Sequence, residues 1–519
     1  MTLRWMTVVF GALVAGAGGA AAGDKTDVVR DLAGRVGPIV GSALACRDIS
    51  RPRIQVIVDK FTAVITEASS SEAERSDLTQ LLDRSVADGR SAVTSGRIDC
   101  RVADRQLGDL ERSIAGPGPS LAAVIAPSFA TAATAPTAPV AAVAGPPVRG
   151  VSDREIRFGI AGPFSGSSKE LGRQMKLGID AAFNRTNEAG GVEGRMLKLI
   201  AADDGFEPTR TAEAMKQLYE KDQVFGLIGN VGTATAAVAV PYALERRMLF
   251  FGGFTGANVI RHDPPDRYVF NYRASYAEET DAAVRYFVKM RRIPPRQIAV
   301  FAQHDAGGDA GFAGVAKSFR SLGFSDSGIL RLNYERNTVD VEDAVNQLKA
   351  QKVPIKAVVM ISAYRPAARF IEKTRDLFPG MLYSNISFVG ATALADELML
   401  LGPRYASGAI VTQVVPSVSG YSSIVLEYKT AIAKYFPGEA PDYVSLEGYV
   451  SANILIQALK RCGPQLDTEK LIDVLENTRQ LDLGLGAQLG FGRAEHQASH
   501  KIWGTALDES GKYQAIELE

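Results

Sequence analysis

The sequence has no excess of charge of either sign, and it lacks the motifs of the common cofactor-dependent enzymes. Its 519 residues include 58 Lys plus Arg and 58 Asp plus Glu, a formal net charge of zero. This balance argues against a broad surface for a polyanion, so nucleic acid is not an expected partner. No GxGxxG follows a predicted strand, GPFSGSSK lacks the P-loop spacing, and GPFSG is not the GxSxG nucleophile elbow. The sequence therefore predicts no cofactor and no enzymatic activity.

Metal ligands and activated nucleophiles are also scarce. His496 and His500 are four residues apart and could share a helical face as metal ligands. They lie in a polar segment near Gly492, with no matching set of Cys or Glu, so no metal site is predicted. A hydrolase would need an activated nucleophile, and no such group is recognisable.

Long uncharged apolar runs are missing beyond the N-terminus, so no later segment is expected to span a membrane. Arg4, the apolar run 6–14 and the small residues 15–22 follow the plan of a cleavable secretory signal. An uncleaved membrane anchor is the alternative, but the run is short for a bilayer and is diluted by glycine. No Cys lies near the cleavage site, which removes the simplest route to a lipid anchor. We expect residues 1–22 to be a signal peptide and the mature protein to be periplasmic.

The three cysteines are unevenly placed. Cys46 and Cys100 lie in the N-terminal segment, whereas Cys462 stands alone far downstream. In an oxidising compartment the first two are natural partners, and a small domain gains most from such a crosslink. We predict a Cys46–Cys100 disulfide; two buried thiols are the alternative.

Composition divides the chain into three parts after the signal. Residues 23–115 show apolar positions at three- to four-residue spacing, which predicts a small helical module. Residues 116–150 are rich in Pro and Ala with almost no charge, which is typical of an extended linker. Residues 151–519 alternate short apolar strands with amphipathic helices, which predicts an α/β fold with mostly parallel sheets.

Two series of strands follow one another in this last part. The first covers 156–161, 196–202, 224–229 and 248–253, with a helix over 171–188 after the first strand. The second covers 297–303, 328–334, 356–362, 386–390 and 409–414. Two series in one unit imply two lobes, and a ligand is expected in the cleft at the carboxyl ends of the strands.

The α/β part resembles the branched-chain-amino-acid (Leu/Ile/Val-binding) type of periplasmic binding protein, the substrate receptors of ABC importers. Matching segments occur in the family's order, although each is modest alone: RFGIAGPFSGSSKELGRQMKLGIDAAF at 157–183, NEAGGVEGRMLKLIAADDGFEPTRTAEAMKQL at 187–218, VFGLIGNVGTATAAVAVPYA at 224–243, FFGGFTGANVIR at 250–261, FNYRASYAEET at 270–280, GAIVTQVVP at 408–416 and SLEGYVSANILIQAL at 445–459. The resemblance implies a type I periplasmic-binding fold of two Rossmann-like lobes with three crossovers. It places lobe I at about 154–274 and 415–486, and lobe II at about 275–414 and 487–519.

The segment GNVGTATAAV predicts an anion-binding helix start. Its glycines allow a sharp turn after a strand, and Thr233, Ala234 and Thr235 then open a helix whose free N–H groups can hold a carboxylate. Either Thr could instead be an ordinary N-cap. The resemblance favours ligand binding, since the family binds its ligand's carboxylate at this place.

The resemblance also implies other contacts with the ligand. Phe254 and Thr255 occupy the place where the family offers backbone carbonyls and a hydroxyl, although Phe254 could be plain core. Ser165 follows the first strand, and Tyr276 and Tyr364 lie in regions that the family places in the cleft.

Three departures from the family pattern bear on the ligand. Leu171 and Gly307 fall near positions where the family commonly has an aromatic residue. Thr392 lies where amino-acid-binding members commonly use a carboxylate to pair with the ligand's ammonium. A buried ammonium without a partner is costly, so either another acid such as Asp305 replaces it or the ligand is not an α-amino acid. This favours a carboxylate-bearing ligand without an α-ammonium.

The resemblance implies binding without chemical turnover. The expected function is a periplasmic receptor that delivers a small ligand to the permease subunits of an ABC importer, contacting the membrane only through that permease. A ligand-sensing module coupled to a signalling partner, with the helical segment as its transmitting part, is the alternative.

Overall fold

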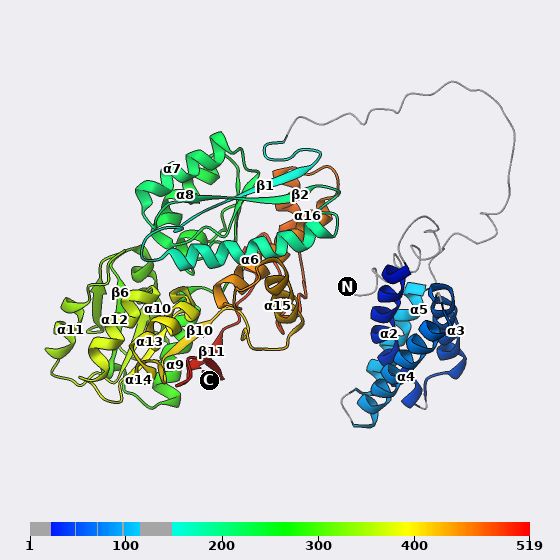
Figure 1. Cartoon of the computed structure of the whole chain (residues 1–519). Helices are drawn as coiled ribbons and strands as arrows, with labels where there is room; N and C mark the ends of the chain where they lie inside the picture. The colour runs from blue at the N-terminus through cyan, green and yellow to red at the C-terminus, as the bar shows by residue number, and fades with distance from the viewer. Residues whose placement is uncertain (1–21, 47, 70, 96–97, 115–147) are drawn as a thin grey trace, which may run out of the picture. The chain divides into compact units, whose positions relative to one another are not determined.

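The computed structural model describes residues 22–46, 48–69, 71–95, 98–114 and 148–519. They fall into two compact units, one before the Pro/Ala-rich segment and one after it (Figure 1). The predicted signal peptide up to residue 21 and the predicted linker from 116 to 147 lie outside the described residues. Within the described ranges, no helix is long and apolar enough to cross a membrane.

The N-terminal unit consists of helices with their own core. Its helices are α2 (Ala22–Ala45), α3 (Arg51–Ala68), α4 (Glu72–Thr94) and α5 (Cys100–Ile114). Val36, Phe61 and Leu107 are each buried in this core, as their periodic spacing predicts. Cys46 and Cys100 form a disulfide with their Cα atoms 5.6 Å apart, so the end of α2 is joined to the start of α5.

Lobe I of the α/β unit is a parallel five-stranded sheet in the order β2-β1-β3-β4-β5. Its strands are β1 (Glu155–Gly162), β2 (Met196–Asp203), β3 (Gly226–Ile228), β4 (Leu249–Phe251) and β5 (Val269–Phe270). Its early helical elements are α6 (Lys169–Glu188), α7 (Pro208–Lys216), η2 (Gln217–Lys221), α8 (Thr233–Glu245) and η3 (Asn258–Ile260). The chain later returns with α15 (Ser423–Tyr435), α16 (Tyr443–Cys462) and α17 (Thr468–Glu476), and α16 packs against α6 (Figure 1).

Lobe II is a seven-stranded sheet in the order β12-β11-β10-β9-β8-β6-β7, parallel except at β11 and β12. Its strands are β6 (Ile298–Gln303), β7 (Leu330–Tyr334), β8 (Ala357–Ile361), β9 (Leu382–Asn385), β10 (Ile410–Gln413), β11 (Trp503–Leu507) and β12 (Tyr513–Ile516). Its helical elements are α9 (Tyr276–Arg285), η4 (Tyr286–Met290), η5 (Pro295–Gln297), α10 (Ala306–Ser321), α11 (Glu342–Lys349), α12 (Tyr364–Arg375), η6 (Ser387–Val389), α13 (Ala391–Leu401) and α14 (Pro403–Ala406). Every residue of β6 and β8 is buried, as expected for strands covered on both faces.

The two-lobed fold confirms the predicted fold class, with two local differences. The strand expected at 386–390 lies at 382–385, and the apolar run that suggested it forms η6 instead. The last crossover follows His496 rather than lying at 487. The Phe491 ring lies 6.2 Å from that of Phe251 and 5.3 Å from that of Phe270, and His496 stacks on Phe270, so this segment still packs on lobe I.

Candidate functional site

The carboxyl ends of the parallel strands of both lobes meet at an interlobe cavity. Lobe I supplies Phe206 and Thr233, which follow β2 and β3, and Tyr276 begins α9 just after the first crossover. Lobe II supplies the rest of the lining: Gln303, Asp305, Gly307, Gly308, Tyr334, Ile361, Ser362 and Phe388. The cavity measures about 10 Å³, room for about one water molecule.

Thr233 and Tyr276 line one wall of this cavity, and their hydroxyl groups meet that of the buried Thr255. Thr233 Oγ1 and Thr255 Oγ1 are 2.7 Å apart, and the Tyr276 hydroxyl hydrogen-bonds with both side chains. Burial raises the pKa of Tyr276, so the phenol keeps its proton near neutral pH. Thr233 is also the first residue of α8, whose N-cap Gly232 supplies no capping side chain. Hydroxyls and uncapped N–H groups at a helix start are groups that bind a carboxylate.

Four aromatic rings fill the space beside these hydroxyls. The centroid of the Phe388 ring lies 6.0 Å from that of Phe206, 5.5 Å from that of Phe254 and 6.3 Å from that of Tyr276. Phe388 comes from lobe II, whereas Phe206 and Phe254 come from lobe I. These separations are typical of favourable aromatic pairs, so the rings hold the lobes together.

The lobe II wall is built around the N-terminus of α10. Asp305 Oδ1 accepts hydrogen bonds from the N–H groups of Gly307 and Gly308, at 2.9 and 3.2 Å. Gln303 Nε2 donates to Asp305 Oδ2 at 2.6 Å. A Cβ at Gly307 would lie 3.1 Å from Thr233 Oγ1, so the glycine allows the lobes to approach closely. Asp305 is thus the N-cap of α10, and both of its carboxylate oxygens accept hydrogen bonds within lobe II although it lines the cavity.

A polar latch joins the lobes at one edge of the cleft. Glu207 of lobe I accepts hydrogen bonds from Arg336 Nη2 at 3.0 Å and from Asn337 Nδ2 at 2.5 Å. Asn337 Nδ2 also donates to the carbonyl oxygen of Gly205 at 3.1 Å. We call Glu207, Arg336 and Asn337 the latch; these contacts stabilise the lobes in the closed arrangement.

A buried ionic cluster lies where the chain crosses between the lobes. Arg273, Glu279 and Glu447 have side chains that are 1%, 0% and 3% exposed. Arg273 Nη2 is 3.3 Å from Glu279 Oε1, and Arg273 Nε is 3.6 Å from Glu447 Oε1. Burial raises the pKa of Glu447 to about 7, although Arg273 opposes this shift. Sequence reasoning missed this cluster, because Glu447 is distant in the chain from Arg273 and Glu279.

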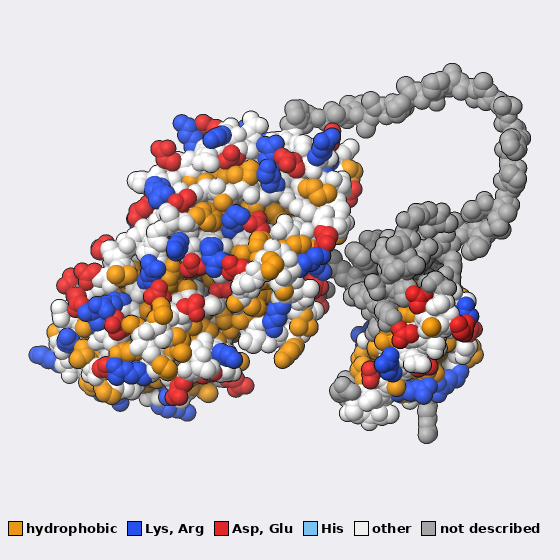
Figure 2. Space-filling view, in the orientation of Figure 1, with side chains coloured by type: hydrophobic (Ala, Val, Ile, Leu, Met, Phe, Trp, Pro, Cys, Tyr) orange, Lys and Arg blue, Asp and Glu red, His pale blue; other side chains and the backbone are white. Residues whose placement is uncertain are grey.

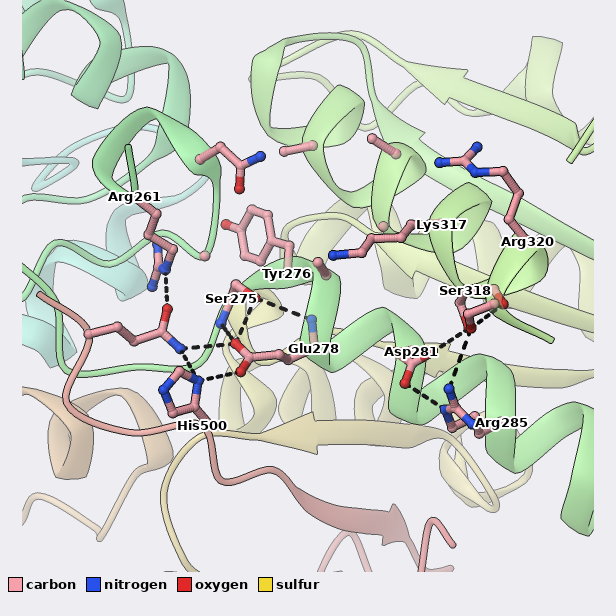
Figure 3. A pocket seen from close by; sticks show the side chains of 18 residues that line it. Arg261, Ser275, Tyr276, Glu278, Asp281, Arg285, Lys317, Ser318, Arg320 and His500 are labelled. Carbon is pink, nitrogen blue, oxygen red and sulfur yellow. Dashed lines mark hydrogen bonds and ion pairs between the residues drawn. The ribbon is translucent and has the colours of Figure 1, made fainter. Parts of the chain in front are cut away.

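A second, larger groove shares Tyr276 with the interlobe cavity (Figure 3). It measures about 690 Å³ and is lined mainly by α9, α10 and the segments 256–261 and 497–500. Its charged side chains largely pair with one another. Arg285 Nε contacts Asp281 at 2.6 Å, His500 Nδ1 contacts Glu278 at 2.6 Å, and Arg261 donates to Gln497 and to backbone carbonyls.

The two histidines considered as metal ligands have separate surroundings. His496 is buried, and its Nδ1 lies 2.9 Å from the carbonyl oxygen of Val269, whereas His500 pairs with Glu278. Across the ranges that the structure describes, no group of three or more His, Cys, Asp or Glu side chains is placed to hold a metal ion.

This arrangement of two α/β lobes around a small cleft matches a known family. A family model described as "Periplasmic binding protein" matches residues 155–512. The chain belongs to this family. The match begins at β1, so the N-terminal helical unit lies outside it.

Individual members support this assignment. The chain is 24% identical over 348 residues to the Leu/Ile/Val-binding protein BraC3 of Rhizobium johnstonii, covering 64% of this chain and 86% of that one. A solved structure from Rhodopirellula baltica, described as a possible leucine/isoleucine/valine-binding protein, is 37% identical with a TM-score of 0.67, covering 72% of this chain and 99% of that one. The isoleucine complex of LivJ from Streptococcus pneumoniae shares the fold at 18% identity and a TM-score of 0.59, covering 70% of this chain and 100% of that one.

Four of the ligand-binding residues predicted for this periplasmic binding protein lie together. Thr233, Phe254, Thr255 and Tyr276 are all buried around the hydroxyl wall and the aromatic rings. Ala234 follows Thr233 in the first turn of α8 and is partly exposed.

The other predicted residues have different partners. Ser165 is exposed and donates to Asp203 Oδ2 at 2.6 Å, and Thr235 donates to the carbonyl oxygen of Val231 within its own helix start. Thr392 hydrogen-bonds with Asp442, the buried N-cap of α16, whose pKa is raised by burial. Tyr364 is buried near Gly390, where the side chain of Leu171 crosses from lobe I.

Phe206, Phe388 and the latch also lie at the cleft of the binding protein, and the sequence did not predict them. Sequence reasoning had no signal for Phe206 or the latch. Phe388 lay inside the run expected to be a strand, and its position before Gly390 at the end of that run was the only hint.

Proposed function

We propose that this periplasmic binding protein captures a small carboxylate-bearing solute between its lobes in the periplasm and delivers it to the permease of an ABC importer. The observation that carries the proposal is the hydroxyl wall of Thr233, Thr255 and Tyr276 at the uncapped start of α8. These groups can donate several hydrogen bonds to one carboxylate in a site closed off from water. The family membership and the names of the relatives support a binding role rather than catalysis.

The latch supports a mechanism of capture by closure. A solute would first contact lobe I, which holds two of the three hydroxyls, and Glu207 would then pair with Arg336 and Asn337 of lobe II. Such hinge closure couples ligand binding to the relative position of the lobe surfaces. A permease can distinguish the closed form from the open one by that position.

The experiment is a thermal-shift screen of the full chain against amino acids, aromatic acids, dicarboxylates and amides. A ligand at about 100 times its dissociation constant adds about 2.7 kcal/mol of stability. Loss of uptake of the identified solute in cells lacking the protein would then support the importer role. A panel that leaves the melting curve unchanged contradicts the proposal.

The Thr233→Val variant tests the hydroxyl wall. Losing a hydrogen bond to a charged group costs about 1.5–3 kcal/mol, so we expect affinity about 10- to 100-fold weaker by calorimetry. Thr235→Val is the matched control, because that hydroxyl bonds to the Val231 carbonyl and does not line the cavity. Equal losses in both variants would show that the wall does not hold the ligand.

A sensory role is the second candidate, favoured by the helical unit. That unit has its own core and disulfide and lies outside the residues matched by the family model. Binding of a signalling protein to the isolated α/β unit and to the full chain would separate the two roles. Partner binding that depends on α2–α5 and on ligand favours sensing.

A further inference from the structure

Phe388 lines the interlobe cavity from lobe II and packs there against other aromatic rings. Its side chain is 6% exposed, and three other rings surround it. The rings of Phe206 and Phe254 are tilted by 31° and 32° to it, and Tyr276 meets it edge-on at 76°. Two tilted rings and one edge-on ring thus surround Phe388 and form a cage that holds a flat ring.

The small volume of the interlobe cavity limits what can bind there. Ligand pockets usually measure about 300–1,000 Å³, whereas this cavity measures about 10 Å³. A solute larger than water therefore cannot enter while the Phe388 ring stays in the cage. Either the lobes open or the ring leaves, and where the ring leaves, the ligand takes a space shaped for an aromatic ring.

The backbone that presents Phe388 is tied to the buried ionic cluster. The N–H of Ser387 donates to Glu279 Oε2 at 2.7 Å, and Ser387 Oγ donates to Glu279 Oε1 at 3.0 Å. Arg273 also donates to Ser387 Oγ. Gly390 follows with φ of 75°, which lets the chain turn away into α13. Phe388 is thus held in the cage by residues at the first crossover between the lobes.

The hydroxyl wall, rather than charge, favours a carboxylate beside the cage. The Arg273 guanidinium lies 4.8 Å from the centroid of the Phe254 ring and is buried. It is paired with Glu279 and Glu447, at 3.3 and 3.6 Å, so it brings no uncompensated positive charge to the cage. The hydroxyls of Thr233, Thr255 and Tyr276 are the groups that can donate hydrogen bonds to a carboxylate there.

We propose that the Phe388 ring is a built-in plug that holds the place of the ligand's own ring, and that the ligand is an aromatic acid without an α-ammonium group. This inference rests on the proposed capture of a solute between the lobes. On binding, the ligand's ring replaces that of Phe388 against Phe206, Phe254 and Tyr276, and its carboxylate meets the hydroxyl wall.

The test compares the Phe388→Ala variant with the unmodified chain by calorimetry, using phenylacetate, hexanoate and choline as probes. Removing the plug opens the cage, so we expect phenylacetate to bind the variant at least about tenfold more tightly than the unmodified chain. Hexanoate should gain less, and choline should not bind. Phe370→Ala is the matched control: it removes a buried ring stacked on Phe301 that does not line the cavity, and it should gain nothing.

Each other outcome overturns the proposal in a distinct way. An unchanged affinity in Phe388→Ala shows that the ring is no plug, and an equal or larger gain for hexanoate or choline shows that the ligand class is wrong. If another solute from the thermal-shift screen binds the unmodified chain tightly, the proposed function survives either failure. If no probe or solute binds any variant, both proposals fail.

Phe388→Leu replaces Phe388→Ala if the alanine variant does not fold. Leucine keeps apolar volume but lacks the flat ring, so we expect a smaller gain in phenylacetate affinity.

Discussion

At the scale of single residues, hydroxyl groups that look alike in the sequence have different hydrogen-bond partners in the site. Thr233 and Thr235 both begin α8, yet Thr233 turns to Thr255 and Tyr276 while Thr235 turns to the Val231 carbonyl. Helical geometry separates the directions of neighbouring side chains, so only one of two such residues can face a given wall. Thr392 likewise binds Asp442, and that acid is already engaged with the backbone N–H of Val444 at 2.7 Å. Thr392 has no charge to offer an ammonium group, and the Asp442 carboxylate already has its own partners.

Glu447 gives the protein a pH-dependent stability. Its folded pKa of about 7 lies above the ordinary glutamate pKa of 4.5, so between these pH values the folded state retains a proton that the unfolded state releases. Stability from this group is therefore present below about pH 4.5 and is lost as the pH rises through 7. A shift of this size corresponds to about 3 kcal/mol at most. We expect urea unfolding to show that Glu447→Gln lacks this part of the loss between pH 5 and pH 8.

The control for Glu447→Gln is a carboxylate whose pKa is lowered, rather than raised, in the folded protein. The pKa of Glu469 is lowered by hydrogen bonds from Tyr268 and Arg267, so Glu469 is ionised throughout that interval. Its partners do not titrate there either, so Glu469→Gln should keep the pH dependence of the unmodified chain. A Glu447→Gln variant with the original pH slope would contradict the assignment.

At the scale of elements, the helical unit depends on its crosslink more than the α/β unit does. The Cys46–Cys100 bridge spans 54 residues, and closing a loop of that size is worth about 4 kcal/mol in the chain-entropy model. The small core of α2–α5 has little else to offset this loss. We expect Cys46→Ser with Cys100→Ser to lower the melting temperature of the helical unit while that of the α/β unit stays the same.

Calorimetric scanning of the full chain measures both transitions. Cys462→Ala is the control, since Cys462 is a free, buried thiol of α16 and its replacement should affect only the α/β transition. A double Cys→Ser variant that melts like the unmodified chain would refute the structural role of the bridge.

At the scale of the whole molecule, the lobes are held closed by aromatic contacts across the cavity and by the latch at its edge. On the face seen in Figure 2, basic and acidic side chains are interspersed. Closure therefore brings together a few specific cross-lobe contacts rather than one large charged surface.

The latch should set part of the closure equilibrium. Arg336 and Glu207 are 23% and 38% exposed, and partly exposed ion pairs contribute up to about 1 kcal/mol. We expect Glu207→Gln to weaken ligand affinity by up to about fivefold and to increase the radius of gyration measured by small-angle scattering. Glu397→Gln breaks the Arg365–Glu397 pair within lobe II and should change neither quantity. Identical behaviour of the two variants would exclude a role of the latch in closure.

Hydrophobic periodicity by itself determined the α/β class, the helical module and the two series of strands, since alternation of buried and exposed positions is a local property of the chain. Thr233 was predicted from the glycine-containing turn that precedes a helix start, whereas Thr255 and Tyr276 were predicted only from the resemblance to periplasmic binding proteins. Local pattern could not separate a strand from a buried 3-10 turn at 386–390, where the apolar run is short.

Only the tertiary structure decided what meets across the cleft. Phe388 and Phe254, Glu207 and Arg336, and Arg273 and Glu447 are each more than a hundred residues apart in the chain. Their contacts depend on how the two lobes close, and no local pattern in the sequence carries that information. The helices and strands could be predicted because their causes are local, whereas the plug, the latch and the buried ionic cluster exist only in the folded chain.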